Sequence, residues 1–211
     1  FNNYVMIINA QESNIQVIGD IKEFKSSIDP KNLEFITTLL SSNLYSAPER
    51  SFIRETVSNA WDAQVEAGTT DIPIIIKITE NETNKGSYYY NFTGFGDITI
   101  RDFGTGLSPE RFNDIYRNIG SSTKRESNDY HGAFGIGHLS GFSCSNTMYV
   151  TSYYNGTCYE YIGIKDANTI VYTLVSTTPT TEKSGLEVTL KNVYLEKYSK
   201  SLKYIMFFPN V

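Results

Sequence analysis

The sequence predicts an α+β fold, a two-layer sandwich in which helices cover one face of a mixed, mostly antiparallel sheet. Helical patterns dominate the first third of the 211 residues, strand patterns dominate the second half, and no repeat or linker separates them. Hydrophobic residues make up 40% of the chain and charged residues 19%, which excludes a disordered tail. We therefore expect one domain over residues 1–211.

The first part of the chain begins with an expected strand segment, 1–28, with strands at 5–8 and 15–18. Pro30 and Pro48 each predict a helix start, because proline suits the first helical position. The first helix runs through residue 40, and the second ends before Gly68. The apolar run 72–78 predicts a strand that is buried on both faces.

The middle of the chain predicts a turn at 80–87, a strand opening at 88–92 and a half-buried strand ending near Arg101. Ser108 and Pro109 predict the next helix start. Polar residues 119–131 lack periodicity, which predicts a mobile loop. The remaining elements are a short helix near 136–144, strands at 147–154, 158–164, 169–176 and 186–191, and a helical piece over 194–208. Residues 194–211 are expected to begin a further C-terminal segment.

Charge and composition exclude several classes of protein. There are 18 basic and 23 acidic residues, giving a net charge of −5, and no basic run offers a footprint for nucleic acid. No apolar stretch approaches the roughly 20 residues of a membrane helix. Cys144 and Cys158 are too few for a four-cysteine zinc site, and His131 and His138 lack further ligands at suitable spacing. Without a secretory leader, a reduced cytoplasm is expected.

An acid–amide–acid stripe lies on the expected helix after Pro48. Its members are spaced 4, 3 and 4 residues apart and share one helix face: Glu55, Asn59, Asp62 and Glu66. The pattern is typical of a solvated helix face. It also suits a site in which a glutamate deprotonates a water and an asparagine oxygen binds Mg²⁺. The spacing leaves both interpretations open.

A second motif, Asp102-Phe103-Gly104-Thr105-Gly106, follows the expected strand that ends near Arg101. Alternate glycines let the backbone bend and let a flat ligand approach. A carboxylate there could accept the amino group of adenine, whereas the carbonyl oxygen of guanine would face a second acceptor. An ordinary Asp-Gly turn is the alternative.

A third motif is rich in glycine and directly precedes the expected helix near 136–144. It reads Gly132, Ala133, Phe134, Gly135, Ile136 and Gly137. Backbone N–H groups at such a helix start can hold phosphates, although a turn packed against another element fits as well. The order differs from the dinucleotide-binding fingerprint, and no Gly-Lys-Ser/Thr follows as a P-loop requires.

Taken together and in this order, the motifs resemble those of the GHKL ATPase superfamily, which includes gyrase B, Hsp90, histidine kinases and MutL. Residues 54–63, RETVSNAWDA, are similar to the N-box; Asp102, Gly104 and Gly106 are similar to the adenine box. Gly132, Gly135 and Gly137 resemble the glycine box. The resemblance spans about 30–191 and implies a Bergerat fold with ATP and Mg²⁺ bound beneath a lid, the region 107–131.

The resemblance also implies residue roles. Glu55 would be the general base, Asn59 the Mg²⁺ ligand with Asp62 near the nucleotide, and Asp102 the reader of adenine. Lid groups near the phosphates would be Ser121, Ser122, Thr123 and Lys124. The last motif of the family usually reads Gly-Thr, but here Leu186 follows Gly185; Ser184 or Thr189 could supply the hydroxyl.

Residues 121–156, together with the two earlier motifs, are also similar to the rIIA-type lysis-inhibition proteins of tailed phages. That resemblance implies the N-terminal ATPase domain of a protein that delays host lysis and counters exclusion by a prophage. It implies a location in the host cytoplasm, with peripheral association to the inner membrane through the full-length protein, and a partner phage protein.

Three functions follow from these resemblances. The first is slow ATP hydrolysis that drives lid closure and homodimer formation. In relatives, a lysine or arginine from a following segment contacts the γ-phosphate. That segment is expected to follow residue 211, so hydrolysis by residues 1–211 is expected to be slow. The second is a nucleotide-binding module with little turnover. The third is phosphotransfer as in histidine kinases, which generally lack the glutamate that Glu55 would supply.

Overall fold

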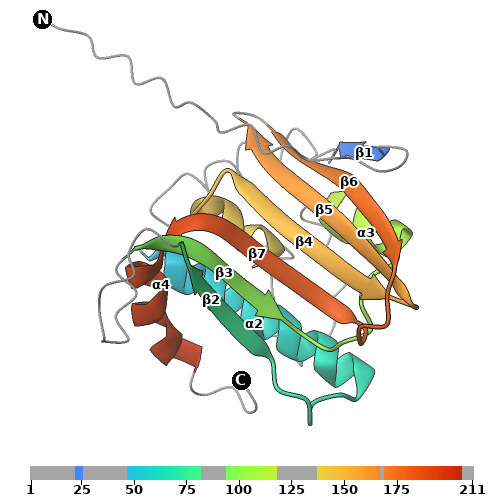
Figure 1. Cartoon of the computed structure of the whole chain (residues 1–211), viewed down its shortest axis with the longest axis horizontal. Coiled ribbons are helices and arrows are strands. Elements are labelled where there is room, and N and C mark those ends of the chain that lie inside the picture. The colour runs from blue at the N-terminus through green and yellow to red at the C-terminus, as the bar shows by residue number, and fades with distance from the viewer. Residues whose placement is uncertain (1–21, 26–46, 82–93, 118–136, 167–168, 206–211) are drawn as a thin grey trace, which may run out of the picture.

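The computed structural model describes residues 22–25, 47–81, 94–117, 137–166 and 169–205. Across these ranges, seven strands form one sheet in the order β1-β6-β5-β4-β7-β3-β2 (Figure 1). Every neighbouring pair of strands is antiparallel. The strands are β1 (Lys22–Lys25), β2 (Ile75–Glu80), β3 (Phe95–Arg101), β4 (Thr147–Tyr154), β5 (Thr157–Asp166), β6 (Thr169–Pro179) and β7 (Gly185–Tyr194).

The helices of the described ranges are α2 (Pro48–Ala67), α3 (Pro109–Arg117), the 3₁₀ turns η2 (Gly137–Ser143) and η3 (Leu202–Ile205), and α4 (Leu195–Ser201). In Figure 1, α2, η2 and α3 lie behind the sheet, and α4 and η3 pack against α2. The α+β prediction, with helices on one face of an antiparallel sheet, is confirmed. The predicted mixed character is not seen among the described strands, whose pairs are all antiparallel.

Helix α2 follows the prediction closely. Pro48 occupies its first position, and the carboxylate of Glu49 in the first turn suits the positive end of the helix dipole. Gly68 ends the helix in the left-handed conformation, with φ 69°. Its apolar residues Phe52 and Val57 are fully buried against the sheet side of the molecule. The hydrophobic spacing therefore sets the orientation of the opposite, polar stripe.

The strand predicted for 72–78 is the main correction to the fold. β2 begins only at Ile75, lies at the edge of the described sheet and pairs there with β3. Its residues alternate between exposed and half-buried, and Ile75 is 49% exposed. Burial on both faces was wrong because the described helices cover one face of this sheet, and an apolar run cannot reveal how many layers surround it.

The other strand predictions agree with the structure to within a few residues, and the predicted helix near 136–144 is the 3₁₀ turn η2. The helical prediction for 194–208 is confirmed for α4 and η3. Ser108 caps α3 through a hydrogen bond from the Arg111 N–H to its Oγ, 3.2 Å long. Predictions for 5–8, 15–18, 30–40, 88–92 and 119–131, and nearly all of 80–87, lie outside the described residues.

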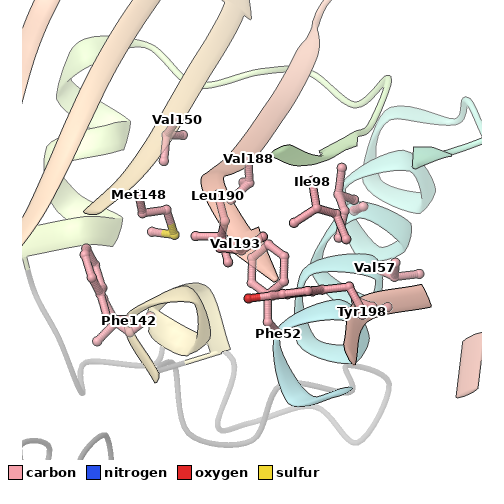
Figure 2. Packing of buried hydrophobic residues seen from close by; sticks show 14 of the residues in the cluster. Phe52, Val57, Ile98, Phe142, Met148, Val150, Val188, Leu190, Val193 and Tyr198 are labelled. Atoms are coloured by element: carbon pink, nitrogen blue, oxygen red, sulfur yellow. The ribbon is translucent and has the colours of Figure 1, made fainter. Parts of the chain in front are cut away.

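The core fills the layer between the sheet and the helices (Figure 2). Leu190 of β7 and Phe52 of α2 are fully buried there. Gly141 of η2 makes room for Met148 and Leu190, since a Cβ at this position would lie 2.6 Å from the Met148 Sδ and 3.3 Å from the Leu190 Cδ2. No helix in the described ranges is long and apolar enough to cross a membrane.

Leu190→Ala should lower the free energy of unfolding by about 2–5 kcal/mol, because a fully buried side chain is removed and the close-packed surroundings collapse only in part. Denaturant unfolding measures this loss. Ile164→Ala on β5, where the side chain is 51% exposed, is the matched control and should change stability by less than about 1 kcal/mol. Equal losses in the two variants would contradict this location of the core.

Candidate functional site

Glu55 and Asn59 lie on α2 beside the first residue of η2. A Cβ added to Gly137 would lie 2.9 Å from Glu55 Oε2 and 3.5 Å from Asn59 Nδ2. The Glu55 side chain is 20% exposed, and its other oxygen, Oε1, accepts a hydrogen bond from Arg54 Nη2 at 2.8 Å. The absence of a side chain at Gly137 thus lets the end of the glycine motif approach the acid–amide pair closely.

The polar stripe of α2 is not a uniform solvated face. Glu55 and Asn59 are half-buried, Asp62 is only 8% exposed, and only Glu66 is fully at the surface, where Arg111 pairs with it at 3.0 Å. The cause is the packing of η2 against α2. The solvated-face interpretation is therefore wrong for the first three members of the stripe and correct for Glu66.

Asp102 directly follows β3 and is 5% exposed. Its Oδ1 accepts hydrogen bonds from the N–H groups of Gly104 at 2.8 Å and Leu186 at 3.1 Å. Its own N–H donates to the Leu186 carbonyl at 2.9 Å. Burial raises the pKa of Asp102 to about 6, opposed by the two backbone N–H groups and then by the Arg101 charge. The carboxyl group is thus fixed in place and costly to ionise.

Glycines bring the Asp102 segment against its neighbours on two sides. A Cβ on Gly104 would lie 2.8 Å from the Ala63 Cβ of α2, and one on Gly185 would lie 2.1 Å from the Asp102 carbonyl oxygen. Ala63 is two turns further along α2 than Glu55, about 12 Å at 1.5 Å per residue. The two predicted motif regions therefore lie along one helix, separated by roughly the length of an extended nucleotide.

The turn after Asp102 is also joined to β4. Gly106 has φ 69°, and a Cβ there would lie 2.2 Å from the Tyr153 carbonyl oxygen. The Ser152 hydroxyl accepts from the Leu107 N–H at 2.7 Å and donates to the Leu107 carbonyl at 2.8 Å. These contacts explain physically why the motif needs glycine at Gly106 and why its backbone is rigid.

Gln64 is a positioning residue that the sequence did not reveal. It is fully buried, and its Nε2 donates to the carbonyls of Thr69 at 3.0 Å and Ile72 at 2.7 Å. Its Oε1 accepts from the Phe103 N–H at 3.2 Å, and the Thr69 hydroxyl donates to the Phe103 carbonyl at 2.8 Å. A glutamine near the end of a helix gives no signal of this kind, because its partners come from two separate segments, the loop after α2 and the turn after β3.

Thr189 is a correction to the predicted site. Its hydroxyl lies 2.9 Å from that of Thr99, and strand alternation places it on the sheet face opposite Val188 and Leu190, which are buried on the helix side. It therefore does not lie beside Asp102. Ser184, the other candidate, is exposed; the backbone of Leu186 contacts Asp102 instead.

The remaining predicted residues divide clearly. Gly137, Gly104, Asn59 and Glu55 are described, and the contacts above bring them to the two ends of one helix face. Gly106 is described as well and lies against Tyr153 of β4. The other predicted lid and glycine-motif residues lie outside the described ranges: Ser121, Ser122, Thr123, Lys124, Gly132, Ala133, Phe134, Gly135 and Ile136.

The match to a family model decides the family. The model described as "Histidine kinase-, DNA gyrase B-, and HSP90-like ATPase" covers residues 45–192, which include every site element above. The chain belongs to this ATPase family. As a histidine kinase-, gyrase B- and HSP90-like ATPase, it carries a GHKL-type ATP-binding module, as the sequence predicted. No curated protein matches the chain.

The residues of this ATPase at the Gly137 end fit a hard cation. Glu55 and Asn59 offer a carboxylate and an amide oxygen, the ligand types that Mg²⁺ prefers. Within the described residues, no group of three or more His, Cys, Asp or Glu side chains could hold a metal ion.

Proposed function

We propose that this chain binds ATP with Mg²⁺ and hydrolyses it slowly, in a cycle of lid closure and homodimer formation. One observation carries the proposal: Glu55 and Asn59 beside Gly137, and Asp102 beside Leu186 and Gly104, lie at two ends of one face of α2. That arrangement provides separate places for a triphosphate and for a purine ring.

At the purine end, Asp102 is proposed to read adenine. Its Oδ1 already accepts two backbone N–H groups, so Oδ2 remains to accept from the exocyclic amino group. Guanine presents a carbonyl oxygen at that position, which would leave two acceptors facing each other. Preference for ATP over GTP is the consequence.

At the phosphate end, Glu55 is proposed to act as general base. Its Oε2 faces the Gly137 backbone, where a water could be held next to a terminal phosphate and lose its proton to this oxygen. Asn59 is proposed to hold Mg²⁺, and Asp62 in the next turn is proposed to lie near the nucleotide. The cation would neutralise negative charge on the phosphates. Lid groups at 121–124 and glycines at 132–137 would close over the phosphates.

A second candidate, binding with little turnover, is supported by the ion pair that Arg54 makes with Glu55 Oε1 at 2.8 Å. The Arg54 guanidinium thereby occupies one of the two carboxylate oxygens that could take a proton from water. Phosphotransfer of the histidine-kinase kind stays the third alternative and is disfavoured by the glutamate at this position.

Mg-ATP turnover and the thermal shift produced by nucleotide separate these candidates. An ATPase gives both a shift that is larger with ATP than with GTP and a slow release of phosphate that requires Mg²⁺. A shift without phosphate release supports the binding module. No shift with any nucleotide would reject the proposed function.

The biological role is proposed from the rIIA-type resemblance alone: the ATPase domain of a phage lysis-inhibition and anti-exclusion protein. The protein would be located in the host cytoplasm, associate peripherally with the inner membrane through the full-length protein, and bind a partner phage protein. Expression in a host infected by a lytic phage tests this role, since lysis should be delayed by the parent and not by a Glu55→Ala variant. Identical lysis times would reject it.

A further inference from the structure

A buried arginine lies at the end of β3, directly before Asp102. Arg101 is only 7% exposed. Strand alternation places Ile98 and Ile100 on the helix side of the sheet and Arg101 on the opposite face. No described carboxylate forms an ion pair with it, and its Nη1 is buried without a hydrogen-bond partner. A cation in such a place costs free energy unless other contacts compensate.

Two neighbours hold the guanidinium of Arg101. Nη2 donates to the Lys183 carbonyl at 2.7 Å, in the turn before β7. The guanidinium carbon lies 3.8 Å from the centre of the Tyr153 ring of β4 and 5.1 Å from that of Phe103. Arg101 thus braces the ends of three adjacent strands, β3, β7 and β4, through one planar group.

The same three strand ends support Asp102 from the helix side of the sheet. The turn that Arg101 anchors at Lys183 leads into Gly185 and Leu186, whose N–H donates to Asp102 Oδ1. Tyr153 packs on the guanidinium with its ring and on Gly106 with its carbonyl. A displacement of this brace would therefore move the two groups that fix the carboxylate and its turn.

We propose that Arg101 is a positioning residue for nucleotide recognition: from the outer face of the sheet it fixes the Lys183–Leu186 turn, and its positive charge favours the charged form of the buried Asp102 carboxylate. This inference rests on the adenine role proposed for Asp102. It adds a residue on the opposite face that touches no ligand and that acts together with the N–H groups of Gly104 and Leu186 on the carboxylate.

The electrostatic surroundings of Asp102 are simple enough to test. Arg101 on β3 lowers its pKa, against the larger opposing effect of burial. Tyr116 on α3 has its own pKa raised, by burial first and then by the Asp102 charge. The contacts that β7 makes with Asp102 come from Gly185 and Leu186, which carry no charge. The charged residue of β7 nearest in register is Glu187, the strand partner of Arg101 on the opposite sheet face.

The experiment compares Arg101→Met with Lys191→Met across about pH 5 to 8. Lys191 is the matched control, because it is exposed on the same sheet face and lies over the Tyr149 ring at 4.1 Å without contact to the site. Two quantities are measured: the pKa of Asp102 in the nucleotide-free protein, from its carboxyl ¹³C shift, and the Kd for ATP.

Arg101→Met should raise the Asp102 pKa above its value of about 6 by about half a unit or more, and weaken ATP binding at pH 7 about three- to tenfold. Lys191→Met should change neither. An unchanged pKa in Arg101→Met, or an equal rise in Lys191→Met, overturns the proposal.

If Arg101→Met does not fold, Arg101→Lys replaces it, because lysine keeps the charge but cannot stack on Tyr153 and reach the Lys183 carbonyl together. Weaker ATP binding by Arg101→Lys than by the parent supports the positioning role, and equal binding overturns it. If the parent binds no ATP, the proposed function fails, and the ¹³C titration still decides whether Arg101 controls Asp102.

Discussion

Glu55→Ala should retain ATP binding and lose hydrolysis, with turnover falling about 10²–10⁴-fold, the usual contribution of a positioned general base. Its Oε2 faces the backbone of Gly137, where it can take a proton from a water, whereas the adenine end of the site lies about two helical turns away and is untouched. Single-turnover phosphate release and the Kd for ATP, measured on the same preparation, separate the two effects.

Glu66→Ala is the matched control for Glu55→Ala. Glu66 belongs to the same stripe of α2, but it is exposed and its partner is Arg111 at the surface, a kind of pair that contributes little to stability. Turnover in this control should equal that of the parent. If Glu55→Ala still hydrolyses ATP at the parent rate, Glu55 is not the base.

Asp102→Asn should weaken ATP binding by at least about 100-fold, because an amide donor would replace the acceptor that remains for the adenine amino group. The variant should fold, since the asparagine Oδ1 can still accept the N–H groups of Gly104 and Leu186. Titration calorimetry with ATP measures the loss. Asp97→Asn, on the same strand, where the half-buried Asp97 accepts from the Asn192 N–H, should bind ATP as the parent does.

The free energy of unfolding is a second measurement on Asp102→Asn, and it should not fall although ATP binding is weakened. The pKa of Asp102 rises from 3.8 to about 6 on folding, so between these values the folded protein holds a proton that the unfolded chain releases. Stability of the parent therefore falls as pH rises from about 4 to 6, and about 3 kcal/mol is lost above pH 6. Asparagine does not ionise, so the variant should match or exceed the parent in denaturant unfolding at pH 8.

Loss of both ATP binding and stability at pH 8 would instead show that Asp102 holds the fold rather than the ligand. The raised pKa of Asp102 also predicts that the ATP affinity of the parent declines as pH falls below about 6, because the protonated carboxyl is a poorer acceptor for the amino group. An affinity for GTP equal to that for ATP would contradict the adenine role.

The sequence by itself determined the elements that local physics controls. Pro48 and Gly68 bounded α2 and its apolar stripe oriented it, alternation around Ile98 predicted β3, and the ordered motifs around Glu55 and Asp102 pointed to the ATPase family that the family match shows. Each of these signals lies within a few residues of the chain, where spacing and turn chemistry suffice.

Only the tertiary structure decided what depends on partners distant in sequence. In the structure, Ile75 lies at a sheet edge and Thr189 lies on the sheet face opposite the helices, beside Thr99. The backbone of Leu186, 84 residues away in sequence, contacts the Asp102 carboxylate. Gln64 and Arg101 bind backbone carbonyls, which every residue offers alike. Such contacts leave no pattern in a sequence, because burial and register arise only when the layers assemble.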